Sequence, residues 1–349
     1  MRWAGQKVEG DGGDSSLLSL AGLVRTVRTP EFAGITFHEV AAKSVLNKVP
    51  PTSSMPFSWT INPFRGCSHA CVYCFARKTH SYLDLDTGLD FDSQVVVKIN
   101  AAEVLARELA KPSWRREHVA LGTNTDPYQR AEGRYQLMPG IIRALADSGT
   151  PFSILTKGTL LARDIPLLAE ASRSVTVGTG ISLAMMDPVL ADAIEPGTPA
   201  PKARLALITR LREAGLPCGV LAMPILPWLT DGDESLDHLF GELAAAGAGG
   251  VSAGPLYLRP GSREWFMQWL AVHHPQLVGR YEKLYGRSAY VPADYKDWLN
   301  GRITFFRKKH GLGASAGFFR NLSPDGSRPP SATTSRESPE PAVAQPALF

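Results

Sequence analysis

Ser58-Trp-Thr-Ile-Asn62-Pro-Phe-Arg-Gly-Cys67-Ser-His-Ala-Cys71-Val-Tyr-Cys74 is the segment around which the rest of this 349-residue chain can be interpreted. A β-like run over 58–62 leads directly into three cysteines with the spacing C-x3-C-x2-C. Three thiolates this close in sequence can wrap around one face of a metal cluster. The fourth cysteine, Cys218, is remote, so the cysteines divide into a metal-binding trio and one separate thiol.

Thiolate ligands select zinc, copper(I) or an iron–sulfur cluster. A cubane cluster that is bound by three cysteines keeps one iron without a protein ligand, and that iron can hold a small molecule. Zinc would instead require a fourth protein ligand, for which His69 or His80 is available. The spacing favours the iron–sulfur cluster.

Short β-like runs alternate with helical patterns after the cysteines. The expected strands are 58–62, 118–123, 152–156, 175–183, 218–224 and 250–258, and the expected helices are 103–110, 136–146, 164–171, 202–214 and 235–245. This alternation predicts an α/β fold with a parallel sheet and outer helices. Six strands with right-handed crossovers fit an incomplete (β/α)6 TIM-like barrel. A doubly wound open sheet is the alternative, but no Gly-x-Gly-x-x-Gly follows the first strand.

Composition divides the chain into four parts. We expect a flexible segment over 1–34, the partial barrel over 35–260, a basic helical extension over 261–320 and a disordered tail over 321–349. The tail contains six prolines and five serines and cannot bury enough apolar surface to order itself.

The whole chain is 44% hydrophobic and 20% charged, with a formal net charge of +4, which is ordinary for a globular protein. No run approaches the ~20 apolar residues of a membrane span, and the start of the chain does not resemble a secretory signal. We therefore expect a cytoplasmic protein without a membrane partner. Four cysteines in a reducing compartment are not expected to form disulfides.

The cysteine spacing, with Tyr73 before the last cysteine and a β/α chain behind it, resembles the radical S-adenosylmethionine (radical SAM) superfamily. The longer reading over 63–77, Pro-Phe-Arg-Gly-Cys-Ser-His-Ala-Cys-Val-Tyr-Cys-Phe-Ala-Arg, resembles its spore-photoproduct-lyase-related bacterial branch. The resemblance covers roughly residues 55–300. It implies a [4Fe-4S] cluster on Cys67, Cys71 and Cys74, with S-adenosylmethionine on the open iron. It also implies reductive cleavage of that cofactor to a 5′-deoxyadenosyl radical, with an electron donor of the flavodoxin or ferredoxin type.

The resemblance also assigns candidate cofactor-binding residues. The loop after the second strand corresponds to one that binds the methionine amino group, and Thr123, Asn124 and Asp126 offer acceptors there. The alternative for this loop is a polar turn initiated by Asp-Pro.

Three further cofactor contacts are expected. Lys157 ends the third strand, where a cation can pair with the methionine carboxylate, and the lyase relatives have a lysine at the matching place. Ser182 ends the fourth strand and can bind the ribose or the carboxylate, while Tyr73 matches the aromatic position beside the adenine. The alternatives are a surface lysine, a structural serine and packing of Tyr73 within its loop.

One difference limits the resemblance. Spore photoproduct lyases carry a hydrogen-donating cysteine in the loop after the second strand, and the matching position here is Thr123. The resemblance therefore does not predict repair of spore photoproduct itself. Cys218 lies near the start of an apolar strand and is expected to be a buried structural cysteine.

Charged residues suggest what the protein binds. Arg65, Arg77 and Lys78 flank the cysteines, either as solvated loop charges or as groups that tune the cluster or bind an anion. Residues 251–320 contain eleven lysines and arginines against four acidic residues, including the run 307–310, and many aromatics. Such a face suits phosphates and unstacked bases, although a solvated amphipathic extension gives the same pattern.

We therefore expect a radical SAM enzyme, lyase-like or a transferase, whose substrate the sequence does not determine; the first candidate is a nucleic-acid base, by analogy with DNA photoproduct lyases. The alternatives are a non-catalytic iron–sulfur or zinc protein that binds nucleic acid, and a radical SAM enzyme that modifies a protein or peptide.

Overall fold

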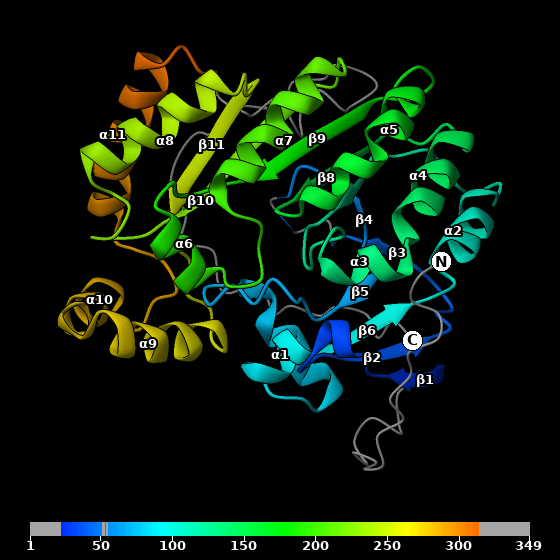
Figure 1. Ribbon diagram of the computed structural model, residues 1–349, viewed down its shortest axis with the longest axis horizontal. Coiled ribbons are helices and arrows are strands. Elements are labelled where there is room, and N and C mark those ends of the chain that lie inside the picture. The colour runs from blue at the N-terminus through cyan, green and yellow to red at the C-terminus, as the bar shows by residue number, and fades with distance from the viewer. Residues whose placement is uncertain (1–21, 51–52, 54, 314–349) are drawn as a thin grey trace.

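A seven-stranded sheet lies at the centre of the computed structural model, which describes residues 22–50, 53 and 55–313 (Figure 1). Its order is β11-β10-β9-β8-β7-β4-β3. Six of the strands are parallel and follow one another in chain order: β4 (Trp59–Ile61), β7 (Val119–Leu121), β8 (Phe152–Thr156), β9 (Val177–Ser182), β10 (Cys218–Ile225) and β11 (Gly250–Pro255). β3 (Leu46–Lys48) adds an antiparallel edge. Over the described residues β3 and β11 stay at opposite edges, so the predicted incomplete (β/α)6 barrel is confirmed.

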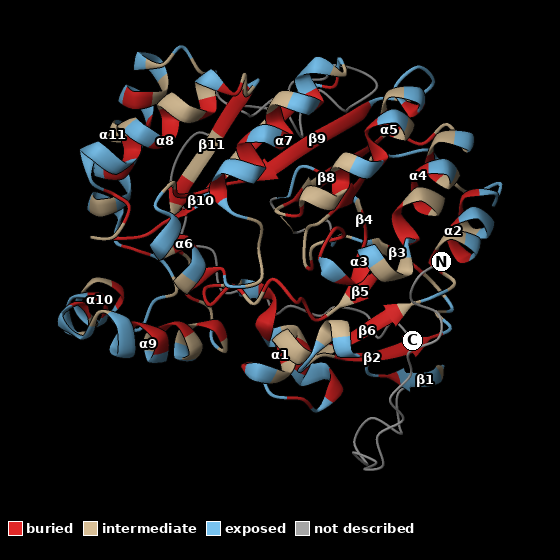
Figure 2. Ribbon diagram, in the orientation of Figure 1, coloured by how far each residue is buried: buried red, intermediate tan, exposed pale blue. Residues whose placement is uncertain are grey.

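Helices connect the parallel strands and cover the outside of the sheet (Figure 1). They are α2 (Ala101–Leu109), α4 (Leu137–Asp147), α5 (Ile165–Ala171), α7 (Pro201–Glu213) and α8 (Asp233–Ala245), each within two residues of its expected range. The predicted inward face of α4 is confirmed, because Leu137, Ile141, Ile142 and Leu145 are all buried. Figure 2 shows the same division, with exposed outer helix faces over buried strands.

The described part of the chain also contains shorter helices. They are α1 (Leu89–Ser93), α3 (Arg130–Tyr135), α6 (Pro188–Ile194), and the 3-10 helices η2 (Pro30–Phe32), η3 (Phe75–Leu83), η4 (Thr159–Asp164) and η5 (Pro275–Leu277).

A second sheet was not predicted from the sequence. It has the order β1-β2-β6-β5 and consists of β1 (Leu23–Val27), β2 (Thr36–Val40), β6 (Gln94–Lys98) and β5 (Phe64–Arg65). β1 pairs with β2, and Arg25 Nε lies 2.6 Å from Glu39 Oε2. The expectation of a flexible segment is therefore wrong for residues 22–34, because backbone pairing and this ion pair order them. Residues 1–21 and the tail expected over 321–349 lie outside the described residues.

Three helices follow the barrel: α9 (Ser262–His273), α10 (Val278–Tyr285) and α11 (Ala293–Lys309). α11 packs against α8 and β11. α9 and α10 form a second hydrophobic cluster with the cysteine segment. Members of this cluster are Cys71, Tyr73, Leu256, Leu258, Phe266 and Tyr281. No helix in the described part of the chain combines the length and the apolarity needed to cross a bilayer.

Candidate metal centre and cofactor site

The cysteine segment is held by strands and helices that come from distant parts of the sequence. β5, just before the first cysteine, pairs with β6. The amide of Cys67 then donates to the carbonyl of Phe91 at 2.9 Å, and the amide of Val72 donates to that of Ile194 at 3.0 Å. Cys67 and Cys71 are buried and Cys74 is half-buried. The segment is therefore a shaped part of the interior rather than a surface loop.

Gln129 is a positioning residue that sequence reasoning missed. Its side chain is fully buried, accepts from the amide of Ser68 at 2.8 Å and donates to the carbonyl of Gly66 at 3.1 Å. These two bonds bracket Cys67 and fix the backbone around it. The sequence carries no signal for this role, because a glutamine after a polar turn is usually exposed.

The space around the segment is tight. Gly197 donates its amide to the carbonyl of His69 at 3.1 Å. A Cβ at Gly197 would lie only 1.9 Å from the carbonyl oxygen of Ser68. Glycine is required here because the turn after α6 lies directly on the cysteine segment.

The donor set fits an iron–sulfur cluster better than zinc. Burial, the largest cause, raises the pKa of Cys74 to about 11 and that of Cys71 well above its ordinary value. Thiols in such surroundings ionise when a metal supplies positive charge. Zinc in a structural site takes four protein ligands, whereas this segment offers three cysteines. A cubane cluster instead binds each cysteine through a different iron.

The two histidines considered as zinc ligands have other partners. His69 Nδ1 lies 3.3 Å from Asp126 Oδ2 as an ion pair, and His80 Nε2 lies 2.9 Å from the carbonyl of Gln94. Burial lowers the pKa of His69, but the charges of Asp126 and Cys67 outweigh burial and raise it to about 10. Both histidines are thus held by protein groups outside the cysteine trio.

Glu195, at the end of α6, joins two of the predicted cofactor residues, Tyr73 and Lys157, and was not predicted itself. It is 1% exposed. Its Oε1 lies 3.1 Å from Lys157 Nζ, and its Oε2 lies 2.7 Å from a guanidinium nitrogen of Arg204. The Tyr73 hydroxyl also donates to it. Burial raises the pKa of Glu195, but Lys157 and Arg204 outweigh burial and lower it to about 2.

Lys157 and Ser182 lie at the carboxyl ends of the neighbouring strands β8 and β9. Lys157 Nζ donates to Ser182 Oγ at 2.7 Å and lies 5.6 Å from the centre of the Tyr73 ring. The structure therefore brings Tyr73, Lys157 and Ser182 into one cluster around Glu195.

Asp126 is occupied by protein donors. Its Oδ1 accepts from the amide of Tyr128 at 2.8 Å and from the hydroxyl of Thr156 at 2.5 Å, and its Oδ2 accepts from the amide of Lys157 at 2.6 Å. Together with His69, these contacts join the cysteine segment to the ends of β7 and β8. Burial raises the pKa of Asp126, but His69 and these hydrogen bonds lower it overall.

Thr123 and Asn124 differ from Asp126. Both side chains are half-buried, and neither forms a hydrogen bond with another residue in the part of the chain that the structure describes. They therefore remain available to a ligand.

Arg77 is fully buried, which corrects the expectation of a solvated charge. Its guanidinium donates to the carbonyls of Cys71 and Gly88, and to Asp92 at 2.8 and 3.0 Å. It also lies 5.0 Å from the ring centre of Trp265 on α9. Arg77 thus anchors the cysteine segment to α1 and α9. Cys218 is buried at the start of β10, as expected for a structural thiol.

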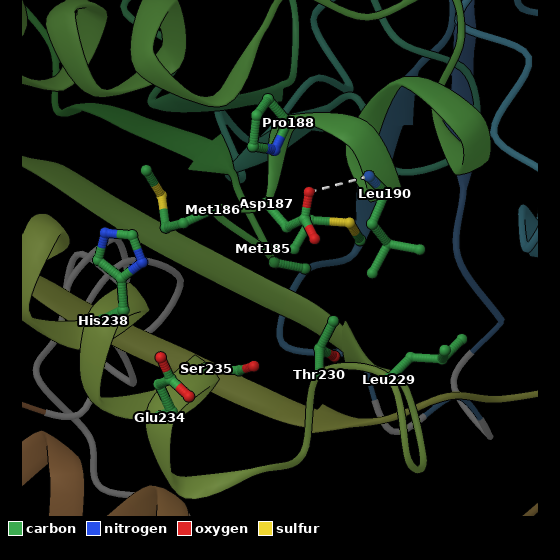
Figure 3. A pocket seen from close by; sticks show the side chains of 11 residues that line it. Met185, Met186, Asp187, Pro188, Leu190, Leu229, Thr230, Glu234, Ser235 and His238 are labelled. Carbon is green, nitrogen blue, oxygen red and sulfur yellow. Dashed lines mark hydrogen bonds between the residues drawn. The ribbon is translucent and has the colours of Figure 1, made fainter.

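A cavity of about 230 Å³ lies between the start of α6 and the start of α8 (Figure 3). Met185, Asp187 and Leu190 line it from one side, and Glu234, Ser235 and His238 line it from α8. None of the predicted cofactor or cluster residues lines this cavity.

Comparison with known proteins identifies the family. The family described as the radical SAM superfamily matches residues 61–240, which is more than half of the chain. The chain belongs to the radical SAM superfamily. The cofactors of this superfamily are a [4Fe-4S] cluster and S-adenosylmethionine, and the cysteine trio fits the cluster.

The chain is also similar to individual relatives and to solved structures. Uncharacterized proteins of Mycobacterium tuberculosis and Mycobacterium bovis are 59% identical over 93% of this radical SAM chain and 96% of their own length. A protein of Acidianus two-tailed virus is 28% identical over 59% of the chain and 70% of its own length. Spore photoproduct lyase complexed with dinucleoside spore photoproduct has a TM-score of 0.59 at 14% identity, with 80% of each chain covered. This likeness shows the fold.

Proposed function

We propose that this radical SAM protein reductively cleaves S-adenosylmethionine and acts on a nucleic-acid base. One observation carries the first part: Tyr73, between two of the cysteines, donates to Glu195, which pairs with Lys157. A charged cluster therefore lies directly against the cysteine segment. When bound, the two cofactors supply a 5′-deoxyadenosyl radical, and the residues of the chain bind, orient and shield them.

Charge balance favours a carboxylate ligand in this cluster. Lys157 and Arg204 carry two positive charges and Glu195 carries one negative charge, so one positive charge remains. Lys157 Nζ uses two of its three N–H groups on Glu195 and Ser182. The third N–H is left for the methionine carboxylate.

The other predicted contacts divide by their partners. Thr123 and Asn124 would accept from the methionine ammonium, because neither has a described protein partner. Ser182 and Tyr73 would adjoin the rest of the cofactor. Asp126 would act indirectly, since its oxygens already hold the ends of β7 and β8.

Two observations support a nucleic-acid base as the substrate. The C-terminal region is rich in cationic and aromatic residues, and the fold is similar to that of spore photoproduct lyase. The position that matches the hydrogen-donating cysteine of the lyases is Thr123, and the remaining thiol, Cys218, is buried at the amino end of β10. We therefore propose a base substrate other than spore photoproduct. The electron donor would be of the flavodoxin or ferredoxin type, in the reducing cytoplasm.

Anaerobic reconstitution with iron and sulfide tests this proposal. We expect a reducible cluster by electron paramagnetic resonance, and 5′-deoxyadenosine after addition of dithionite and S-adenosylmethionine. Cys71→Ala should abolish both signals, and the matched variant Cys218→Ala should retain both. A fully loaded cluster that yields no 5′-deoxyadenosine would overturn the enzyme proposal in favour of a non-catalytic protein.

A further inference from the structure

Two tyrosines form a stacked pair on the surface beyond the last strand of the barrel. Tyr257 follows β11 and Tyr290 precedes α11, and their ring centres lie 4.4 Å apart with an interplanar angle of 26°. The amide of Leu258 donates to the carbonyl of Ala289 at 2.9 Å, which holds the two loops together. Tyr290 is 65% exposed, so the pair presents an aromatic ring to solvent.

A guanidinium completes this surface. The central carbon of the Arg259 guanidinium lies 5.1 Å from the centre of the Tyr257 ring, and its Nε donates to the Tyr257 hydroxyl at 3.0 Å. No carboxylate among the described residues pairs with Arg259. The charge therefore remains available to an anion beside an exposed aromatic ring.

The pair is attached to the candidate active site through its neighbours in sequence. Leu256 and Leu258, on either side of Tyr257, are buried in the hydrophobic cluster that contains Cys71 and Tyr73. The Tyr285 hydroxyl on α10 also donates to the carbonyl of Leu256 at 2.7 Å. Loops at the carboxyl ends of parallel strands carry the chemistry of β/α barrels, and the 256–259 segment follows such an end directly.

The charge distribution favours this surface over the end of α11. Lys309 and His310 both bind Asp237, at 2.8 and 2.6 Å, and Arg302 binds Asp233 at 2.5 Å. These pairs use much of the α11 charge to fasten it to α8. Residues 256–291 instead hold five arginines and lysines against two glutamates.

We propose that Tyr257, Tyr290 and Arg259 form a platform on which an unpaired base of a single-stranded nucleic acid stacks, with Arg259 binding a neighbouring phosphate. Stacking on an aromatic side chain and attraction of phosphate are the two interactions that bind single strands with little sequence preference. This inference rests on the proposed function and specifies where its substrate binds.

Fluorescence anisotropy of the reconstituted protein with a labelled single-stranded oligodeoxynucleotide tests the platform. We expect Tyr290→Ala to weaken binding by about tenfold or more, and Tyr290→Phe to restore it, since a phenyl ring also stacks. Arg259→Gln should weaken binding and reduce its dependence on salt concentration. Phe305→Ala is the matched control, because Phe305 is 63% exposed on α11 and should leave binding unchanged.

The outcomes separate the two proposals. Equal binding by the wild type and Tyr290→Ala would overturn the platform, as would an equal loss in Phe305→Ala. Binding of a peptide without binding of the oligodeoxynucleotide would overturn it in favour of a protein substrate. Formation of 5′-deoxyadenosine without nucleic acid, measured in the same preparations, tests the proposed cofactor cleavage independently and should be unchanged in Phe305→Ala.

Discussion

Lys157 Nζ lies 3.1 Å from Glu195 Oε1, and this ion pair connects the end of the third parallel strand with the cysteine segment. Buried charges persist only when they are paired and hydrogen-bonded. Glu195 meets that condition through Lys157, Arg204 and Tyr73. Its single carboxylate therefore orients the side chains that we assign to the cofactor.

Glu195→Gln should lower the free energy of unfolding by roughly 3–5 kcal/mol, because it leaves two buried cations without a counter-charge. Denaturant titration of the wild type and the variant measures the difference. Glu103→Gln, an exposed position on α2, is the control and should change stability little. A small effect at Glu195 would show that solvent screens the cluster.

The same carboxylate predicts a pH dependence. The pKa of Glu195 is about 2 in the fold against an ordinary 4.5, because Lys157 and Arg204 outweigh burial. Because the pKa of Glu195 is lower in the fold, its carboxylate stabilises the folded state at pH values above 4.5. That stability is lost as the pH falls toward 2. The contribution is about 3 kcal/mol. The stability difference between the wild type and Glu195→Gln should therefore shrink between about pH 5 and pH 2, and a constant difference would contradict this assignment.

Lys157→Met should weaken binding of S-adenosylmethionine by about tenfold or more, because it removes the charge assigned to the methionine carboxylate. Iron content should be unchanged, since Lys157 is not a cluster ligand. Anaerobic calorimetric titration measures the affinity, with Lys308→Met on the exposed side of α11 as the control. If the variant bound S-adenosylmethionine as tightly as the wild type, Lys157 would not be the partner of the methionine carboxylate.

A pair of glycine variants tests how closely the cysteine segment is packed. Gly197→Ala should cost roughly 1–3 kcal/mol and reduce iron loading, because the new Cβ would overlap the carbonyl of Ser68. Gly301→Ala lies within α11 with open space around it and should stabilise the protein by roughly 0.5–1 kcal/mol. Thermal unfolding and iron analysis compare the two. Normal iron loading in Gly197→Ala would mean that the turn after α6 can move.

Hydrophobic periodicity predicted the elements of the barrel well. The bounds expected for β8 agree with Phe152–Thr156, and the inward residues of α4 are buried. The sequence also placed Lys157 and Ser182 at the ends of the third and fourth strands, where the structure has them. Local patterns of this kind are visible in a single sequence, since neighbours along the chain determine them.

Other features depend on contacts between distant residues. In the sequence, Glu195 is an ordinary acidic residue at the end of a short helix. Only the structure shows that Lys157 and Arg204 pair with it. In the sequence, Arg77 is a charged residue of a loop. Only the structure shows that Asp92 and Trp265 contact it. The small sheet was missed because β1 is mostly exposed, and its backbone pairing with β2 carries no compositional signal.

The anchors of the cysteine segment come from later parts of the chain. The segment forms hydrogen bonds with three residues that follow it in the sequence, namely Phe91, Gln129 and Ile194. During synthesis, the segment can acquire its shape only after α6 has left the ribosome. Zinc fingers fold because they bind metal. In this protein, contacts with downstream residues shape the cysteine segment as well, so a chain that ends before α6 would lack one of its anchors.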